Sequence, residues 1–68
     1  MPVRWVYLAG TEWIPFDAAA QMVIEKLWDN GIGGGWTAHF GGQVYINLDT
    51  ELYALINGQR CSLGRTIY

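Results

Sequence analysis

Only one segment of the 68-residue chain has the apolar periodicity of a helix, and this restricts the folds open to it. Across Ala18–Asn30 the apolar residues recur at helical spacing and form one stripe: Ala20, Val23, Ile24, Leu27 and Trp28. Asp17 is a favourable N-cap before this segment, and Gly31 is a favourable stop after it. We therefore expect a single helix over Ala18–Asn30, with polar residues such as Gln21 facing mostly away from the stripe.

The rest of the chain has the pattern of β-strands separated by turns. Runs of β-branched and aromatic residues predict an N-terminal hairpin with strands at Val3–Ala9 and Trp13–Phe16. After the helix, period-two alternation and turn signals at 41–42 and 57–58 predict more strands. These are Trp36–Phe40, Gln43–Leu48, Glu51–Ile56 and Gln59–Leu63, with a last piece at Arg65–Tyr68. The expected fold class is α+β: one domain over residues 1–68, with one helix packed on a curved antiparallel sheet.

The alternation also assigns side chains to the two faces of the sheet. Val44 and Ile46 belong to the core face, which leaves Tyr45 and Asn47 on the other face. A two-residue turn at 57–58 predicts two cross-strand pairs on an apolar face: Ala54 with Cys61, and Leu52 with Leu63. Large aromatics supply much of the buried area of a small domain. We therefore expect the four tryptophans, at positions 5, 13, 28 and 36, to pack in the core.

Composition and charge argue against several function classes. One cysteine, Cys61, excludes an internal disulfide, and with His39 as the only histidine we expect no zinc site, no other metal and no cofactor. A net charge of −2, with only four lysines and arginines, lacks the basic stripe of a nucleic-acid binder. No apolar run is long enough for a membrane helix, and no secretory signal is recognisable. We expect an intracellular protein, cytoplasmic or nuclear, that binds neither nucleic acid nor membranes.

The sequence gives no sign of catalysis. The glycine-rich run 31–35 follows a helix and leads into a strand, whereas a phosphate-binding loop follows a strand and opens a helix. Cys61, Ser62 and His39 are not combined by spacing with a base and an orienting group. We therefore expect a protein that is not an enzyme.

The ordered set of aromatic and polar residues resembles the WWE domain family. The residues that carry the resemblance are Trp5-x-Tyr7, Gly10, Trp13, Pro15-Phe16-Asp17, Ile24-Glu25, Gly42-x-Val44-Tyr45-x-Asn47-Leu48 and Arg65-x-Ile67. The two tryptophans and the glutamate for which the family is named are resembled by Trp5, Trp13 and Glu25. The resemblance implies a half-barrel of about six antiparallel strands around one helix.

The resemblance also implies a function. WWE domains are binding modules found beside ubiquitin-ligase and ADP-ribosyltransferase domains, and several hold ADP-ribose or the iso-ADP-ribose unit of poly(ADP-ribose). By position, Tyr7 and Tyr45 match aromatic residues of the family's pocket, and Arg65 matches an arginine that meets a phosphate. Asn47 could add a hydrogen bond. The resemblance thus implies a receptor for an ADP-ribose-like ligand, a related adenine nucleotide or an ADP-ribosylated protein.

Two departures from the family pattern keep an alternative open. Ligand-binding members carry a glutamine nine residues after the central-strand tyrosine, where this chain has Ala54, and Ile14 follows the second tryptophan. Both substitutions make the pocket less polar. The alternative is a protein-interaction or self-assembly module with a WWE-like fold, and a small domain without a disulfide or metal is a candidate for a homodimer.

Overall fold

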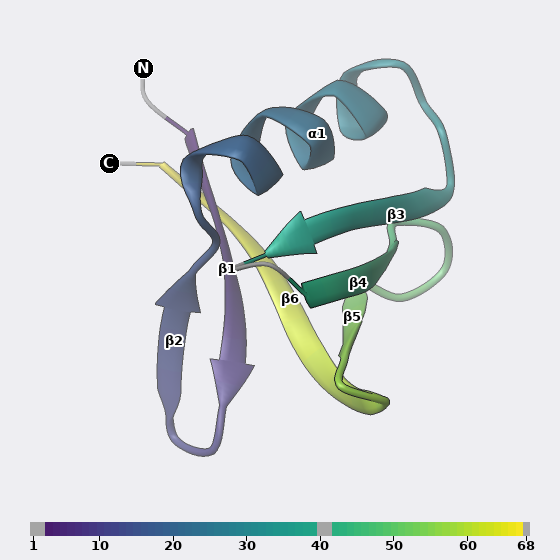
Figure 1. Ribbon diagram of the computed structural model, residues 1–68. Helices are drawn as coiled ribbons and strands as arrows, with labels where there is room; N and C mark the ends of the chain where they lie inside the picture. Colours follow the sequence, from purple (N-terminus) through teal and green to yellow (C-terminus); the bar gives the residue numbers. More distant parts are fainter. Residues whose placement is uncertain (1–2, 40–41, 68) are drawn as a thin grey trace.

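In the computed structural model, which describes residues 3–39 and 42–67, one helix connects the two edge strands of an open antiparallel sheet (Figure 1). The elements are β1 (Val3–Ala9), β2 (Glu12–Pro15), α1 (Ala18–Asp29), β3 (Gly34–His39), β4 (Gly42–Asn47), β5 (Tyr53–Ile56) and β6 (Gln59–Ile67). The six strands lie in the order β2-β1-β6-β5-β4-β3. The predicted α+β class, with six antiparallel strands and one helix, is confirmed. Phe40, Gly41 and Tyr68, which the sequence assigns to strands and a turn, lie outside the described residues.

The last strand differs from its prediction. The two pieces expected at Gln59–Leu63 and Arg65–Tyr68 are one strand, β6, through Ile67. Its first part pairs with β5 and its second part with β1, so β6 joins the two halves of the sheet. Gly64 lies within this strand and marks no break.

Local signals at the ends of the elements are confirmed. The Asp17 carboxylate caps α1 by accepting a hydrogen bond from the Ala20 N–H at 2.9 Å. Gly31, with φ of +66°, follows the C-cap. Asn57 and Gly58 both have positive φ, as a two-residue hairpin turn requires. The register predicted from this turn holds, because Ala54 pairs with Cys61 and the Leu63 N–H donates to the Leu52 carbonyl.

One side of α1 meets the core, but the predicted apolar stripe is only partly buried. Ala20 and Ile24 are fully buried, and Leu27 packs against the core. Val23 and Trp28, expected in the same stripe, remain exposed. The helix packs against β1 and β3, and only the row of Ala20, Ile24 and Leu27 faces the core.

Gln21, expected to face mostly away from the stripe, instead completes the sheet. The Phe16 N–H donates to the Trp5 carbonyl, but the reciprocal bond between Trp5 and Phe16 is replaced by the glutamine amide. Gln21 Oε1 accepts from the Trp5 N–H at 2.6 Å, while Nε2 donates to the Phe16 carbonyl at 3.1 Å and to the Trp5 carbonyl at 2.9 Å. A helix side chain thus replaces the last backbone hydrogen bond between the ends of β1 and β2.

The prediction that all four tryptophans pack in the core is wrong for three of them. Trp5 is buried, with 1% of its surface exposed, whereas Trp13, Trp28 and Trp36 are 52%, 40% and 64% exposed. Trp13 and Trp36 lie on the edge strands β2 and β3, and Trp28 lies in the last turn of α1. The core itself is built around Trp5, Ile24, Val44 and Ile46.

Candidate functional site

The sheet divides at the end farthest from α1 (Figure 1). A recess lies between the two diverging hairpins. The ladder between β1 and β6 extends only to the pair Tyr7–Leu63. Beyond this pair β1 stays with β2, and β6 stays with β5, so the two hairpin ends diverge. Residues 7–10 line one side of the recess, and residues 56, 57 and 59–61 line the other. Its volume is about 310 Å³.

Residues with polar side chains line both sides of this recess. Tyr7 belongs to the core side of β1, where its ring lies 4.9 Å from the ring of Phe16. Asn57, Gln59 and the half-buried Cys61 line the opposite wall. A phenol and two amides provide both donors and acceptors without a net charge. The lining therefore suits a flat, polar and uncharged group.

Arg60 lines the recess, but its guanidinium lies elsewhere. The Leu63 N–H donates to the carbonyl of Leu52, the residue before β5. The alternation of an antiparallel ladder therefore directs the N–H and C=O of Arg60 away from β5 and towards the recess. The guanidinium carbon lies 4.2 Å from the centre of the Tyr53 ring, and the guanidinium pairs with Glu51. Both side chains of this pair are more than half exposed. Exposed pairs contribute about 0–1 kcal/mol, so Arg60 can exchange Glu51 for another anion at low cost.

Arg65, the predicted phosphate contact, is engaged inside the fold. Its Nη2 donates to Glu25 Oε2 at 2.8 Å and its Nε to Glu25 Oε1 at 3.2 Å. Trp5 Nε1 donates to the same Glu25 Oε1 at 2.8 Å. The hydrogen bonds from Arg65 are the main cause that lowers the pKa of Glu25, with a smaller contribution from Trp5, while burial acts in the opposite direction. The carboxylate thus ties α1 to β1 and β6.

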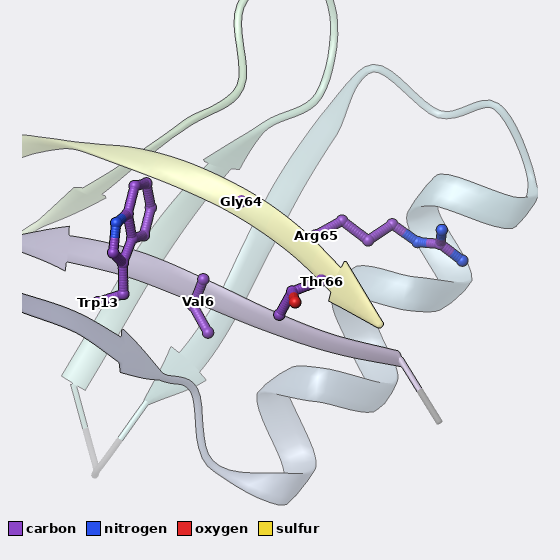
Figure 2. A pocket seen from close by; sticks show the side chains of 5 residues that line it. All are labelled: Val6, Trp13, Gly64, Arg65 and Thr66. Atoms are coloured by element: carbon purple, nitrogen blue, oxygen red, sulfur yellow. The ribbon is translucent and has the colours of Figure 1, made fainter. Parts of the chain in front are cut away.

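A second recess, on the other face of the sheet, is lined by Trp13 (Figure 2). It measures about 350 Å³ over β1 and β6, and its other lining residues are Val6, Gly64, Arg65 and Thr66. A Cβ on Gly64 would lie 3.4 Å from Val6 and 3.5 Å from the indole of Trp13, so glycine lets that ring approach the strand closely. Figure 2 shows the Arg65 side chain directed towards α1 and away from Trp13. The lining of this second recess is mainly apolar, so it has few groups that could bind a charged ligand.

Tyr45 and Asn47 lie apart from Tyr7. They alternate with the buried residues Val44 and Ile46 and so occupy the face of β4 opposite the core. The Tyr45 ring lies 5.2 Å from that of Trp36, and Asn47 Oδ1 accepts from the Asp49 N–H at 3.1 Å. Of the predicted site residues, the recess between the hairpins contains Tyr7 alone.

The residues that sequence reasoning missed are Asn57 and Gln59. Asn57 was assigned to a turn, and Gln59 to the start of a strand. Their position beside Tyr7 depends on where the ladder between β1 and β6 ends. No local pattern predicts that point.

A scan against models of protein families, a search of curated proteins and a search of solved structures found no match. Within residues 3–39 and 42–67, no helix is long and apolar enough to span a membrane. In the same part of the chain, histidine, cysteine, aspartate and glutamate side chains form no group of three that could hold a metal ion.

Proposed function

We propose that the protein is a non-catalytic binding module that holds an ADP-ribose-like ligand in the recess beside Tyr7. The observation that carries the proposal is the division of the sheet, which leaves a polar recess between two hairpin ends. The fold supports it, because six antiparallel strands and one helix are what the resemblance to WWE domains implies. The resemblance supplies the class of ligand.

The size of the recess suggests which part of the ligand enters. Sites for small molecules measure roughly 300–1,000 Å³, and 310 Å³ is at the lower limit. The recess suits an adenosine group better than a whole ADP-ribose. The base would meet Tyr7 and the amides of Asn57 and Gln59, and the phosphates would lie outside the rim. Arg60 is the charged residue of the wall and the nearest candidate to meet them after release from Glu51.

Titration calorimetry with adenosine, ADP-ribose, iso-ADP-ribose and ATP tests the proposal. The variant Gln59→Ala removes one amide from the recess, and Gln43→Ala removes an exposed amide from β4 as a matched control. We expect saturable binding that weakens several-fold in Gln59→Ala, since one hydrogen bond contributes about 1 kcal/mol, and that is unchanged in Gln43→Ala. Absence of heat with every ligand at millimolar concentration would overturn the proposal.

A further variant separates this recess from the opposite face. Tyr45→Ala leaves the recess intact, and we expect it to bind the ligand as the wild type does. If Tyr45→Ala abolished binding in a protein that circular dichroism shows to be folded, while Gln59→Ala did not, the ligand would lie on the face of Tyr45.

A protein-interaction module remains the second candidate function, and the exposed tryptophans favour it. Trp13, Trp28 and Trp36 are each at least 40% exposed in a 68-residue chain. Tryptophan is one of the residue types enriched among those that dominate binding energy at protein interfaces. This second function does not exclude the first, because the recess beside Tyr7 involves none of the three.

A further inference from the structure

The edge strand β3 has backbone groups that no neighbouring strand uses. The Leu48 N–H donates to the Gly33 carbonyl at 2.8 Å, and this bond fixes the alternation of the ladder between β3 and β4. Residues 35, 37 and 39 then bond to β4, whereas 34, 36 and 38 direct their N–H and C=O away from the sheet. Among the described residues, no other backbone–backbone hydrogen bond outside the strand ladders and the helix engages Gly34, Trp36 or Ala38. The Ala38 carbonyl accepts one long hydrogen bond from the Thr37 hydroxyl, at 3.5 Å, and can accept a second.

The outward groups are arranged symmetrically about Trp36. If a second β3 lies antiparallel with its Trp36 opposite the first, residue 34 of each strand faces residue 38 of the other. All three outward residues of each strand then have partners, and none is left over. This is the geometry of a two-fold interface, in which one surface meets an identical surface.

The side chains of β3 also favour another copy of the same strand. Residues 34–38 carry no charge, so two copies can approach along β3 without repulsion there, although the chain has a net charge of −2. The other edge strand, β2, begins with Glu12 and ends with Pro15, residue types that commonly protect an edge from pairing. The absence of charged residues at 34–38 therefore favours β3 over β2 as the edge that pairs with a second copy.

Trp36 would contribute most of the apolar contact. Its ring is 64% exposed and rests against Tyr45 on the face opposite the core. Opposed residues in a hydrogen-bonded antiparallel pair have Cα atoms about 5.5 Å apart, so the two Trp36 rings would pack against each other across the two-fold axis. Aromatic pairs in this position are among the more stabilising cross-strand contacts.

We propose that the protein forms a two-fold homodimer in which the β3 strands of two copies pair antiparallel about Trp36 and join the two sheets into one. The interface lies on β3, away from the recess beside Tyr7, and is independent of the proposed ligand. Each copy keeps its own recess. The dimer and the binding function can therefore be tested separately.

Sedimentation equilibrium from micromolar to millimolar concentration tests this dimer. We expect the wild type to approach twice the mass of one chain as the concentration rises. Trp36→Lys places like charges opposite each other at the axis, and Ala38→Pro removes one outward N–H at an edge position that tolerates proline. Both variants should stay at the mass of one chain, with circular dichroism spectra like that of the wild type.

Met22→Lys is the matched control, because it makes the same charge change at a side chain that is 75% exposed on α1. It should dimerise as the wild type does. Amide hydrogen exchange provides a measurement that needs no variant: the Trp36 and Ala38 amides should become more protected as the wild-type concentration rises. A wild type that stays at the mass of one chain throughout, or a dimer unaffected by both β3 variants, would overturn the proposal.

Discussion

Glu25 is the residue through which three elements are joined. Its carboxylate accepts hydrogen bonds from Trp5 on β1 and from Arg65 on β6, while its own backbone lies in α1. Two of the three residues that resemble the signature of the WWE family are therefore in direct contact. These contacts hold the helix on the sheet. Because Arg65 donates to the same carboxylate, its guanidinium is part of this structural contact.

The lowered pKa of Glu25 predicts an acid-sensitive contribution to stability. Because its folded-state pKa lies below the unfolded-state value of about 4.3, the contribution is full above that value and is lost as the pH falls through the lowered pKa. Urea unfolding of the wild type and Glu25→Gln at pH 7 and below pH 4 measures this. The stability difference between the two proteins should shrink in acid, and an equal difference at both pH values would contradict the assignment.

Ala54 occupies a buried position, where the resemblance to WWE domains would place a glutamine. Its side chain is fully buried between β4 and β6, where Ile46 and Cys61 are its cross-strand partners. Ala54→Gln would force a larger polar side chain into the core and should lower the free energy of unfolding by about 1–3 kcal/mol. Thermal unfolding measures the change. A variant as stable as the wild type would mean that position 54 can open towards solvent.

Glu51 forms an ion pair with Arg60, the charged residue that lines the recess. Glu51→Gln would release the Arg60 guanidinium from its ion pair and make it available to a phosphate at the rim. The proposed function predicts that ADP-ribose binds several-fold more tightly to this variant. Adenosine, which has no phosphate, should bind as it does to the wild type. Titration calorimetry with both ligands checks this. Tighter binding of both ligands alike would assign another role to Glu51.

At the scale of elements, α1 depends on Gln21 for its attachment to β1. Gln21→Ala leaves the Trp5 N–H and the Phe16 carbonyl without the amide that now bonds them. We expect the free energy of unfolding to fall by about 1–3 kcal/mol in urea. Met22→Ala, at the next and well-exposed helix position, is the control and should change stability by less than about 0.5 kcal/mol. Equal effects would show that the amide bonds contribute nothing.

The elements were predictable where local chemistry determines them. Asp17, Gly31 and the Asn57–Gly58 turn set the ends of α1 and the register of β5 on β6, and all three were recognisable. The alternation of a strand, by contrast, separates its two faces without telling which face another element covers. For this reason Trp13 and Trp36 were assigned to the core, although both lie on the face of the sheet opposite to it.

The candidate site was predictable only in part, for a related reason. Tyr7 was identified through a resemblance, but its neighbours Asn57 and Gln59 come from a hairpin about 50 positions later in the sequence. Their meeting depends on where the β1–β6 ladder stops, which is a property of the assembled sheet and not of either segment alone. The alternation along β4, by contrast, was enough to place Tyr45 and Asn47 on the face opposite Val44 and Ile46, away from Tyr7.

At the scale of the whole molecule, three features lie in separate places. The helix and Glu25 hold one end of the sheet together, the recess lies at the other end, and the open edge of β3 lies on the side of the sheet opposite β2. A ligand and a second copy could thus bind without competing. This arrangement follows from β6, which spans both halves of the sheet while its two neighbours diverge.

The central claim is that the recess between the hairpin ends binds the ligand, and an amide-resolved NMR titration with ADP-ribose tests it most directly. We expect saturable shift changes at the amides of residues 8–10 and 59–61, and little change at Tyr45 and Asn47. Shift changes confined to β3 and β4, or none at millimolar ligand, would contradict the account.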